Sequence, residues 1–167
     1  MRTLAPSLLL VLALGRTANA AEFDITGQTC VPSASSIALD NFTTQLGGDV
    51  GVGWLSSNTG TITLYCAIPY LASPSHLEIY YKNNTGCMGC GSDSITVTYV
   101  KMSKTTGALT SIGQLNTSGG VNDGTYRAVS TPFSDNWDNS AYVYYLRIDM
   151  TRANTSNSQE WMESVVY

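Results

Sequence analysis

Apolar and polar residues alternate along most of the chain with the period of two that places one face of a β-strand on a core. The clearest run spans residues 142–151. One face of this run carries Tyr142, Tyr144, Leu146, Ile148 and Met150, and the other carries Val143, Tyr145, Arg147, Asp149 and Thr151. No convincing amphipathic helix follows residue 20. The pattern therefore predicts a chain built almost entirely of strands.

Further runs of this kind divide the rest of the chain at short intervals. We expect strands at 50–54, 62–68, 77–81, 95–102, 109–115, 126–129 and 161–167. The turn residues 56–60 predict that the first two of these strands form a hairpin. Apolar residues change phase at Val100 and Met102, which indicates a β-bulge. About eight short strands at this spacing predict an all-β fold, a single antiparallel β-sandwich or jelly-roll-like domain.

The N-terminal segment differs from the rest in composition. Arg2 precedes an apolar run from Leu4 to Gly15, and small residues stand at Ala18 and Ala20. This order is typical of a secretory signal peptide, and the run is shorter than the roughly 20 residues a membrane-spanning helix needs. We expect residues 1–20 to be a signal peptide, and residues 21–167 to be one secreted or periplasmic domain without stable membrane insertion.

The exported part of the chain contains four cysteines. They are Cys30, Cys66, Cys87 and Cys90. An even number in an oxidising compartment indicates disulfides, and three pairings are possible. We favour Cys30–Cys66 as a staple and Cys87–Cys90 as a local clip. The second pair has the spacing of a redox motif, but no helix follows it that would lower the pKa of the first thiol.

Charge narrows the range of partners. Loss of residues 1–20 would remove Arg2 and Arg16 and move the formal net charge from −4 to −6. Binding to phosphate backbones needs concentrated Lys and Arg, and the chain has no basic cluster. We therefore exclude nucleic acid as a partner and keep a polysaccharide or another surface ligand as the candidate.

No catalytic centre is assembled in the sequence. His76 is the single histidine, and no strained Gly-x-Ser-x-Gly turn accompanies it for a serine triad. A zinc site would need irregular spacings between His76 and the cysteines. A glycosidase needs two carboxylates across a cleft, and nothing singles out a pair among the 12 acidic residues. We expect a protein that is not an enzyme and holds no cofactor, with calcium as the one ion to consider.

The segment Asp135-Asn136-Trp137-Asp138-Asn139 is the candidate binding loop. Clustered carboxylate and amide oxygens suit Ca²⁺, for which Asp135 and Asp138 are the candidate ligands. The same residue types build Asx turns. Trp137, with Asp135, Asp138 and Asn139 around it, is a candidate platform for a sugar ring; the alternative is a tryptophan that closes the end of the sandwich.

Several stretches resemble a group of secreted bacterial β-sandwich proteins. The likeness is carried by residues 94–107, by Asp138 to Arg147, by Leu64-Tyr65-Cys66-Ala67-Ile68-Pro69 and by the closing Val165-Val166-Tyr167. The resemblance implies a bacterial, exported origin and carries over no functional residue.

Three functional hypotheses follow from the sequence. The first is a non-catalytic extracellular binding module, for carbohydrate or a cell surface. The second is a structural subunit that self-assembles into a layer, filament or matrix, for which low charge and disulfides are suited. The third is a small outer-membrane β-barrel, although most apolar runs are shorter than the roughly 9–11 residues of a membrane strand.

Overall fold

The computed structural model describes residues 24–26, 29–38, 42–45, 51–54, 59–68, 76–83, 94–118, 125–153 and 160–166. The predicted signal peptide and the segment holding Cys87 and Cys90 lie outside these residues. The elements are β1 (Asp24–Thr26), β2 (Val31–Pro32), α1 (Ala34–Ala38), β3 (Phe42–Gln45), β4 (Gly51–Trp54), β5 (Gly60–Ala67), β6 (His76–Asn83), β7 (Ser94–Ser103), β8 (Leu109–Asn116), β9 (Tyr126–Pro132), β10 (Tyr142–Arg152) and β11 (Glu160–Val166). In the described part, no helix is long and apolar enough to cross a membrane.

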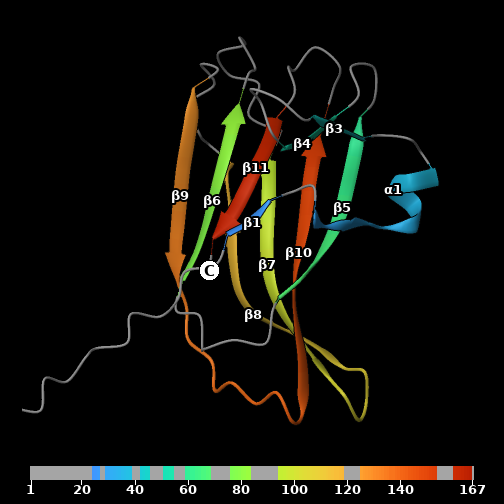
Figure 1. Ribbon diagram of the computed structural model, residues 1–167, viewed down its shortest axis with the longest axis vertical. Helices are drawn as coiled ribbons and strands as arrows, with labels where there is room; N and C mark the ends of the chain where they lie inside the picture. The colour runs from blue at the N-terminus through green and yellow to red at the C-terminus, as the bar shows by residue number, and fades with distance from the viewer. Residues whose placement is uncertain are drawn as a thin grey trace, which may run out of the picture.

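The strands form two antiparallel sheets that pack face to face (Figure 1). The six-stranded sheet has the order β3-β4-β11-β6-β9, with β1 also paired to β11. The five-stranded sheet has the order β2-β5-β10-β7-β8. Every predicted run is found as a strand, and the predicted β-sandwich is confirmed.

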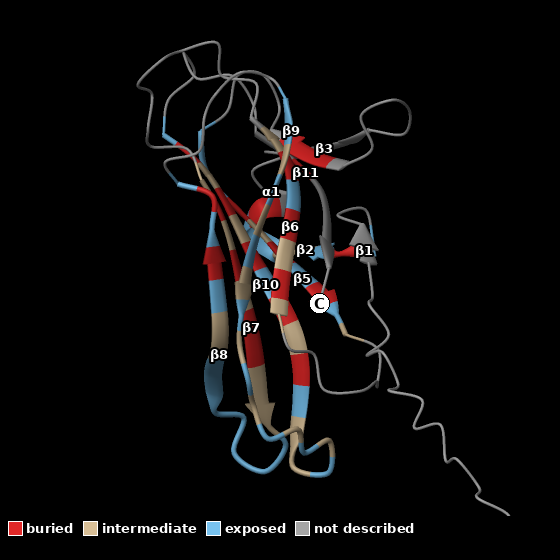
Figure 2. Cartoon of the chain, turned by 90° about the vertical axis from the view of Figure 1, so that its left-hand side faces the viewer, coloured by how far each residue is buried: buried red, intermediate tan, exposed pale blue. Residues whose placement is uncertain are grey.

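The core lies between the sheets and is built by the alternation read from the sequence. Buried residues follow every second position in β5, β7 and β10, as the bands of colour in Figure 2 show. β10 lies in the middle of its sheet and buries Leu146, Ile148 and Met150 completely. Leu77, Ile79 and Met162 meet them from the six-stranded sheet. Each such side chain contributes roughly 1.5–3 kcal/mol by leaving water.

The predicted hairpin of residues 50–54 and 62–68 is wrong. β4 pairs with β3 and β11 in one sheet, whereas β5 pairs with β2 and β10 in the other. Turn residues reverse the direction of the chain, but they do not determine which strand the next strand pairs with. That choice depends on β10 and β11, which are far away in the sequence.

The sequence predicts a β-bulge in the strand of residues 95–102; a bulge is present beside Val100, but it is on the neighbouring strand β8. The register of β7 with β8 shifts between Tyr99 and Val100, because Tyr99 pairs with Gly113 and Val100 with Ser111. The extra residue, Ile112, is therefore on β8. Tyr99 is buried in the core, while Val100 lies on the opposite, outer face and is 6% exposed. The alternation of apolar residues along β7 changes phase at Val100 because an apolar residue lies on the outer face of the sheet there.

The short helix α1 closes the outer edge of β5 next to the two-residue strand β2. The helix begins after Ser33, whose Oγ accepts a hydrogen bond from the Ser36 backbone N–H (3.2 Å) as an N-cap. The buried Ser36 Oγ accepts from the Thr63 backbone N–H at 2.9 Å, and the Ser33 N–H donates to the Thr63 carbonyl oxygen at 2.8 Å. A helix of five residues leaves no periodic signal, so the sequence pattern did not predict it.

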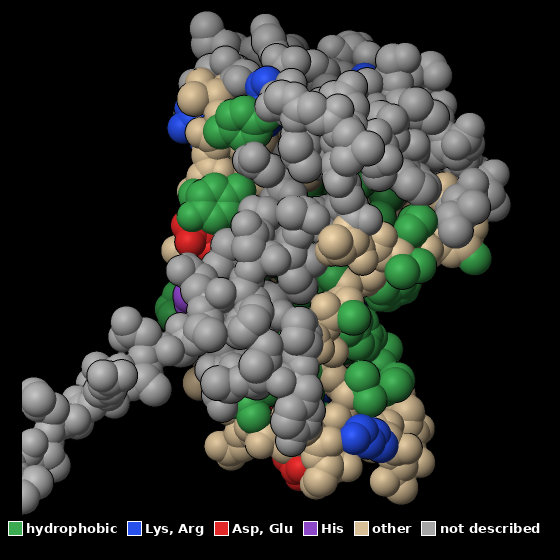
Figure 3. All heavy atoms as spheres, viewed as in Figure 1, with side chains coloured by type: hydrophobic (Ala, Val, Ile, Leu, Met, Phe, Trp, Pro, Cys, Tyr) green, Lys and Arg blue, Asp and Glu red, His purple; other side chains and the backbone are tan. Residues whose placement is uncertain are grey.

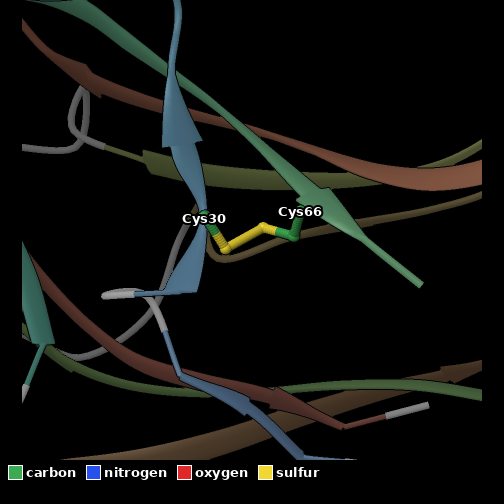
Figure 4. The surroundings of a disulfide bond; sticks show 2 residues. All are labelled: Cys30 and Cys66. Atoms are coloured by element: carbon green, nitrogen blue, oxygen red, sulfur yellow. A yellow bond between two sulfur atoms is a disulfide. The ribbon is translucent and has the colours of Figure 1, made fainter. Parts of the chain in front are cut away.

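A disulfide joins Cys30, just before β2, to Cys66 on β5 (Figure 4). This is the pairing favoured from the sequence. Its two cysteines are 36 positions apart, and a cross-link that closes a loop of this length removes much of the freedom of the unfolded chain. The bond fixes the N-terminal segment to a core strand.

Replacing Cys30 and Cys66 together by Ala should lower the free energy of unfolding by about 2–4 kcal/mol, because the unfolded chain regains this freedom. Urea unfolding followed by tryptophan fluorescence measures the change. The matched control replaces Cys87 and Cys90 by Ala, keeps the Cys30–Cys66 bond, and should lose less, because a bond there would close a much shorter loop. Equal midpoints for wild type and the Cys30/Cys66 variant would contradict the role of the staple.

Candidate functional site

The predicted binding loop lies at one end of the sandwich, between β9 and β10 (Figure 1). The Trp137 ring lies 4.5 Å from the Tyr144 ring and 5.2 Å from the Tyr99 ring, centroid to centroid, and the partly buried Phe133 joins the same cluster. The cluster packs against the core. In the space-filling view, the described atoms at the lower end of the molecule are mostly uncharged, with some hydrophobic side chains and isolated acidic and basic ones among them (Figure 3). Trp137 thus covers the end of the core.

Asp135 is held by a lysine rather than by the other acidic residues of the loop. Lys101 Nζ lies 2.7 Å from Asp135 Oδ1, with both side chains largely shielded from water. The hydrogen bond to Asp135 raises the pKa of Lys101, against the opposing effect of burial. The lysine also lies 5.2 Å from the centre of the Tyr142 ring, close enough for a cation–π contact. The carboxylate therefore anchors the loop to β7.

Asp138 and Asn139 form a turn that leads into β10. Asp138 Oδ1 accepts hydrogen bonds from the Ser140 backbone N–H at 2.9 Å and the Ala141 N–H at 3.2 Å, as in an Asx turn. A further hydrogen bond from the Ser140 hydroxyl is the main cause that lowers the pKa of Asp138. The Asn139 carbonyl oxygen accepts from Lys104 Nζ. Among the described residues, no group of three or more His, Cys, Asp and Glu side chains is placed to hold a metal ion.

Truncation of Trp137 to Ala should lower the free energy of unfolding by about 2–3 kcal/mol, because a partly buried indole leaves a cavity among aromatic rings. Urea unfolding measures this loss. Tyr80→Ala, which truncates a more exposed ring on β6, is the control and should lose clearly less stability than Trp137→Ala. A Trp137→Ala protein of unchanged stability that no longer binds polysaccharide would instead make this ring a ligand platform.

A second surface, not predicted from the sequence, lies on the outer face of the five-stranded sheet. A groove of about 350 Å³ crosses this face from β5 to β8. It is lined by Tyr65, Thr98, Val100, Leu109, Ser111, Gln114, Tyr145, Arg147 and Asp149. Three strand spacings of about 4.8 Å give it a length of roughly 14 Å across the strands.

The groove is built from rows of outward-facing residues that are paired strand by strand. One row, all of which lines the groove, consists of Tyr65, Arg147, Thr98 and Gln114. The next row consists of Thr63, Asp149, Thr96 and Asn116; of these Asp149 lines the groove, and the other three lie beside it. Neighbouring members bind each other: Gln114 Nε2 donates to Thr98 Oγ1 at 3.2 Å, and Asn116 Nδ2 donates to Thr96 Oγ1 at 2.6 Å. The antiparallel register thus places hydroxyl, amide and charged groups side by side on a rigid sheet.

Two tyrosines form the β5–β10 side of the groove. The centres of the Tyr65 and Tyr145 rings are 6.0 Å apart, and their planes meet at 64°. Tyr65 is 41% exposed, whereas Tyr145 is partly buried. Burial raises the pKa of Tyr145, so its hydroxyl stays neutral well above neutral pH. The pair offers flat aromatic surface with hydroxyl groups at its rim.

An ion pair forms the floor beside these rings. Arg147 Nε lies 2.9 Å from Asp149 Oδ2, and Arg147 Nη2 donates to Asp149 Oδ1 at 3.2 Å. The same Oδ1 accepts a hydrogen bond from Thr63 Oγ1 at 2.7 Å. Both partners come from one face of β10, two residues apart, and Thr63 comes from the neighbouring β5. The guanidinium is therefore held in one orientation.

The residues considered for catalysis are not brought together. His76 and Glu78 lie on β6 of the six-stranded sheet, whereas Asp149 lies on β10 of the other. Among the described residues that line the groove, Asp149 is the one carboxylate, whereas the usual glycosidase reaction uses two.

Some residues of this groove could be recognised from the sequence alone. The outward face of 142–151 lists Tyr145, Arg147 and Asp149 at every second position, a dense group for a chain with only 12% charged residues. The contributions of Tyr65, Thr98 and Gln114 depend on strand register, which the sequence pattern does not give.

Comparison with known proteins adds a set of remote structural likenesses. No family model matches this sequence, and no curated protein matches it. A solved xylan-binding module, CBM15, is 11% identical with a TM-score of 0.49, over 89% of this chain and 95% of that one. The CBM22-2 xylan-binding domain from Paenibacillus barcinonensis Xyn10C is 11% identical with a TM-score of 0.46, over 85% of this chain and 88% of that one.

A solved enzyme domain is similar to the same extent. The Agl-KA catalytic domain is 10% identical with a TM-score of 0.48, and the match covers 96% of this chain but 30% of that one. Because all of these TM-scores are below 0.5, the likeness assigns no ligand or activity to this chain.

Proposed function

We propose that the protein is an exported, non-catalytic module that binds polysaccharide along the groove of the five-stranded sheet. The observation that carries the proposal is the combination of two tyrosine rings with a fixed set of polar groups across four strands. Sugars present apolar ring faces edged by hydroxyl groups. Tyrosine matches both parts, because its ring is apolar and its hydroxyl binds water or ligand.

The polar groups support this proposal because they are already ordered. Asp149 is fixed by Thr63 and Arg147, and the amide of Gln114 is bound to Thr98. A ligand that uses such groups pays little additional entropy for ordering them. An open groove across the strands suits a segment of an extended polymer, since the ends of the segment can run beyond the sheet.

Export of the module is inferred from two features together. The N-terminal residues have the pattern of a signal peptide, and the Cys30–Cys66 disulfide is of a kind that persists in oxidising compartments. Polysaccharides of cell walls and surfaces are found in the same surroundings.

Removal of either ring should weaken binding to the preferred polysaccharide at least about tenfold, equivalent to 1.4 kcal/mol. The variants are Tyr65→Ala and Tyr145→Ala, and the measurement is affinity electrophoresis on a panel of soluble polysaccharides followed by calorimetry. Tyr80→Ala is the matched control: Tyr80 is 38% exposed, close to Tyr65, but lies on β6 of the opposite sheet. The control should bind as wild type does.

Two outcomes would contradict the proposal. One is a folded wild-type protein that is retarded by no polysaccharide of the panel. The other is a loss of binding in Tyr80→Ala as large as that in Tyr65→Ala, which would place the ligand on the six-stranded sheet.

A further inference from the structure

We infer that the groove selects an uncharged polysaccharide and rejects one that carries carboxylates, and that Asp149 is the residue that sets this choice. The inference rests on the proposed function and names the ligand class. Of the described residues that line the groove, two are charged, and they have opposite signs. The arrangement of Arg147 and Asp149 therefore sets the charge that a ligand meets in the groove.

The two charges neutralise each other within the groove. Arg147 presents two N–H groups to the two oxygens of Asp149, at 2.9 Å and 3.2 Å. This is the two-pronged geometry in which a guanidinium binds a carboxylate best. An incoming uronic acid finds the Nε–Nη2 edge of Arg147 occupied by a carboxylate of the protein, and it would have to use the remaining Nη edge with Asp149 close by.

Asp149 is also held in a way that makes it hard to displace. Thr63 Oγ1 donates to its Oδ1 at 2.7 Å from the adjacent strand, and the carboxylate is 21% exposed against 50% for the guanidinium. A second carboxylate brought to this place would face Asp149 at short range, and like charges in a partly shielded site repel strongly. The Asp149 carboxylate, which lines the groove, thus disfavours the binding of acidic sugars.

Neutral sugars meet no such barrier. A guanidinium has five N–H groups, and Asp149 takes two of them. The remaining ones can donate to hydroxyl oxygens, which need no charge to be neutralised. The other polar lining groups, such as Thr98, Ser111 and Gln114, are uncharged. The net charge of −4 for the whole chain adds a long-range repulsion of polyanions.

The test compares two polysaccharide classes and two variants. The neutral probes are a glucan, a mannan and a xylan without acidic side groups, and the acidic probes are polygalacturonate and polymannuronate. Wild type should bind at least one neutral probe and bind both acidic probes at least about tenfold more weakly at low salt. Asp149→Asn keeps the size of the side chain and an oxygen that accepts from Thr63, but frees the charge of Arg147.

Asp149→Asn should therefore gain at least about tenfold in affinity for an acidic probe, and the gain should disappear in about 0.5 M NaCl. The matched control is Glu78→Gln, which makes the same change of net charge on β6 of the opposite sheet. It should gain nothing measurable. Thermal unfolding of each variant shows that differences in binding do not arise from loss of fold.

The possible outcomes distinguish failure of the selection against acidic sugars from failure of polysaccharide binding itself. Wild type that binds acidic probes as tightly as neutral ones overturns the inference and leaves carbohydrate binding intact. Asp149→Asn that binds neutral probes without gaining acidic ones overturns the role of Asp149. Equal gains in Asp149→Asn and Glu78→Gln reduce the effect to net charge and overturn it as well. Wild type that binds neither class overturns the proposed function itself.

Discussion

The alternation of β10 between inward and outward residues is the constraint on which both the core and the groove depend. β10 is paired with β5 on one side and β7 on the other, and its inward residues Leu146, Ile148 and Met150 are fully buried. A slip of one residue would expose these three and carry Arg147 and Asp149 into the core. Burial of charged groups is so costly that this register has no competitor. The positions of the groove residues are thus fixed by the hydrophobic effect on the opposite face.

Because burial of the inner face of β10 fixes the positions of its outer residues, a surface site on this strand is ordered by the sheet and not by loops. An exposed ion pair such as Arg147–Asp149 contributes little to stability by itself. Its value lies in orientation, because the backbone of β10 and the hydroxyl of Thr63 determine where the two groups lie. The bulge at Ile112 acts in the same way: it shifts β8 so that Ser111 and Gln114 both line the groove although they are three positions apart.

The parts of the structure that follow from local pattern could be predicted from the sequence, and those that follow from strand partners could not. The alternating faces of β10 are a local signal and follow from the sequence pattern. The phase change at Val100 marks an apolar outer face, and the bulge beside it lies on β8. The Cys30–Cys66 pair was favoured among three possibilities. The hairpin of β4 and β5 was wrong because each strand pairs with a segment far along the chain. β1, β2 and α1 have too few residues to show a period, and β3, with the sequence Phe-Thr-Thr-Gln, has no alternation of apolar and polar residues.

The candidate site was missed for the same reason. Asp135, Trp137 and Asp138 are candidates from the sequence because they lie within four positions, yet their contacts bind the loop to the sandwich. The groove combines residues from four strands, and Tyr65 and Tyr145 meet only through the register of β5 and β10. A binding site on the face of a sheet is best sought in the sequence on a strand that has one strongly apolar face, because the polar residues of its other face are then held on the surface.

The serines around α1 also decide how this protein behaves beside other copies of itself. An unpaired strand edge is a template on which another chain can add a strand, the first step toward aggregates and fibres. Along β5, the two residues of β2 cover part of the strand edge. Pro32 in β2 has no backbone N–H, so it cannot donate a hydrogen bond to a strand from another molecule. At Thr63, where β2 has ended, both backbone groups are already taken by Ser36 Oγ and the Ser33 N–H. Two hydroxyl-bearing residues thus deny neighbouring molecules a docking point on the same strand that supplies Tyr65 to the groove.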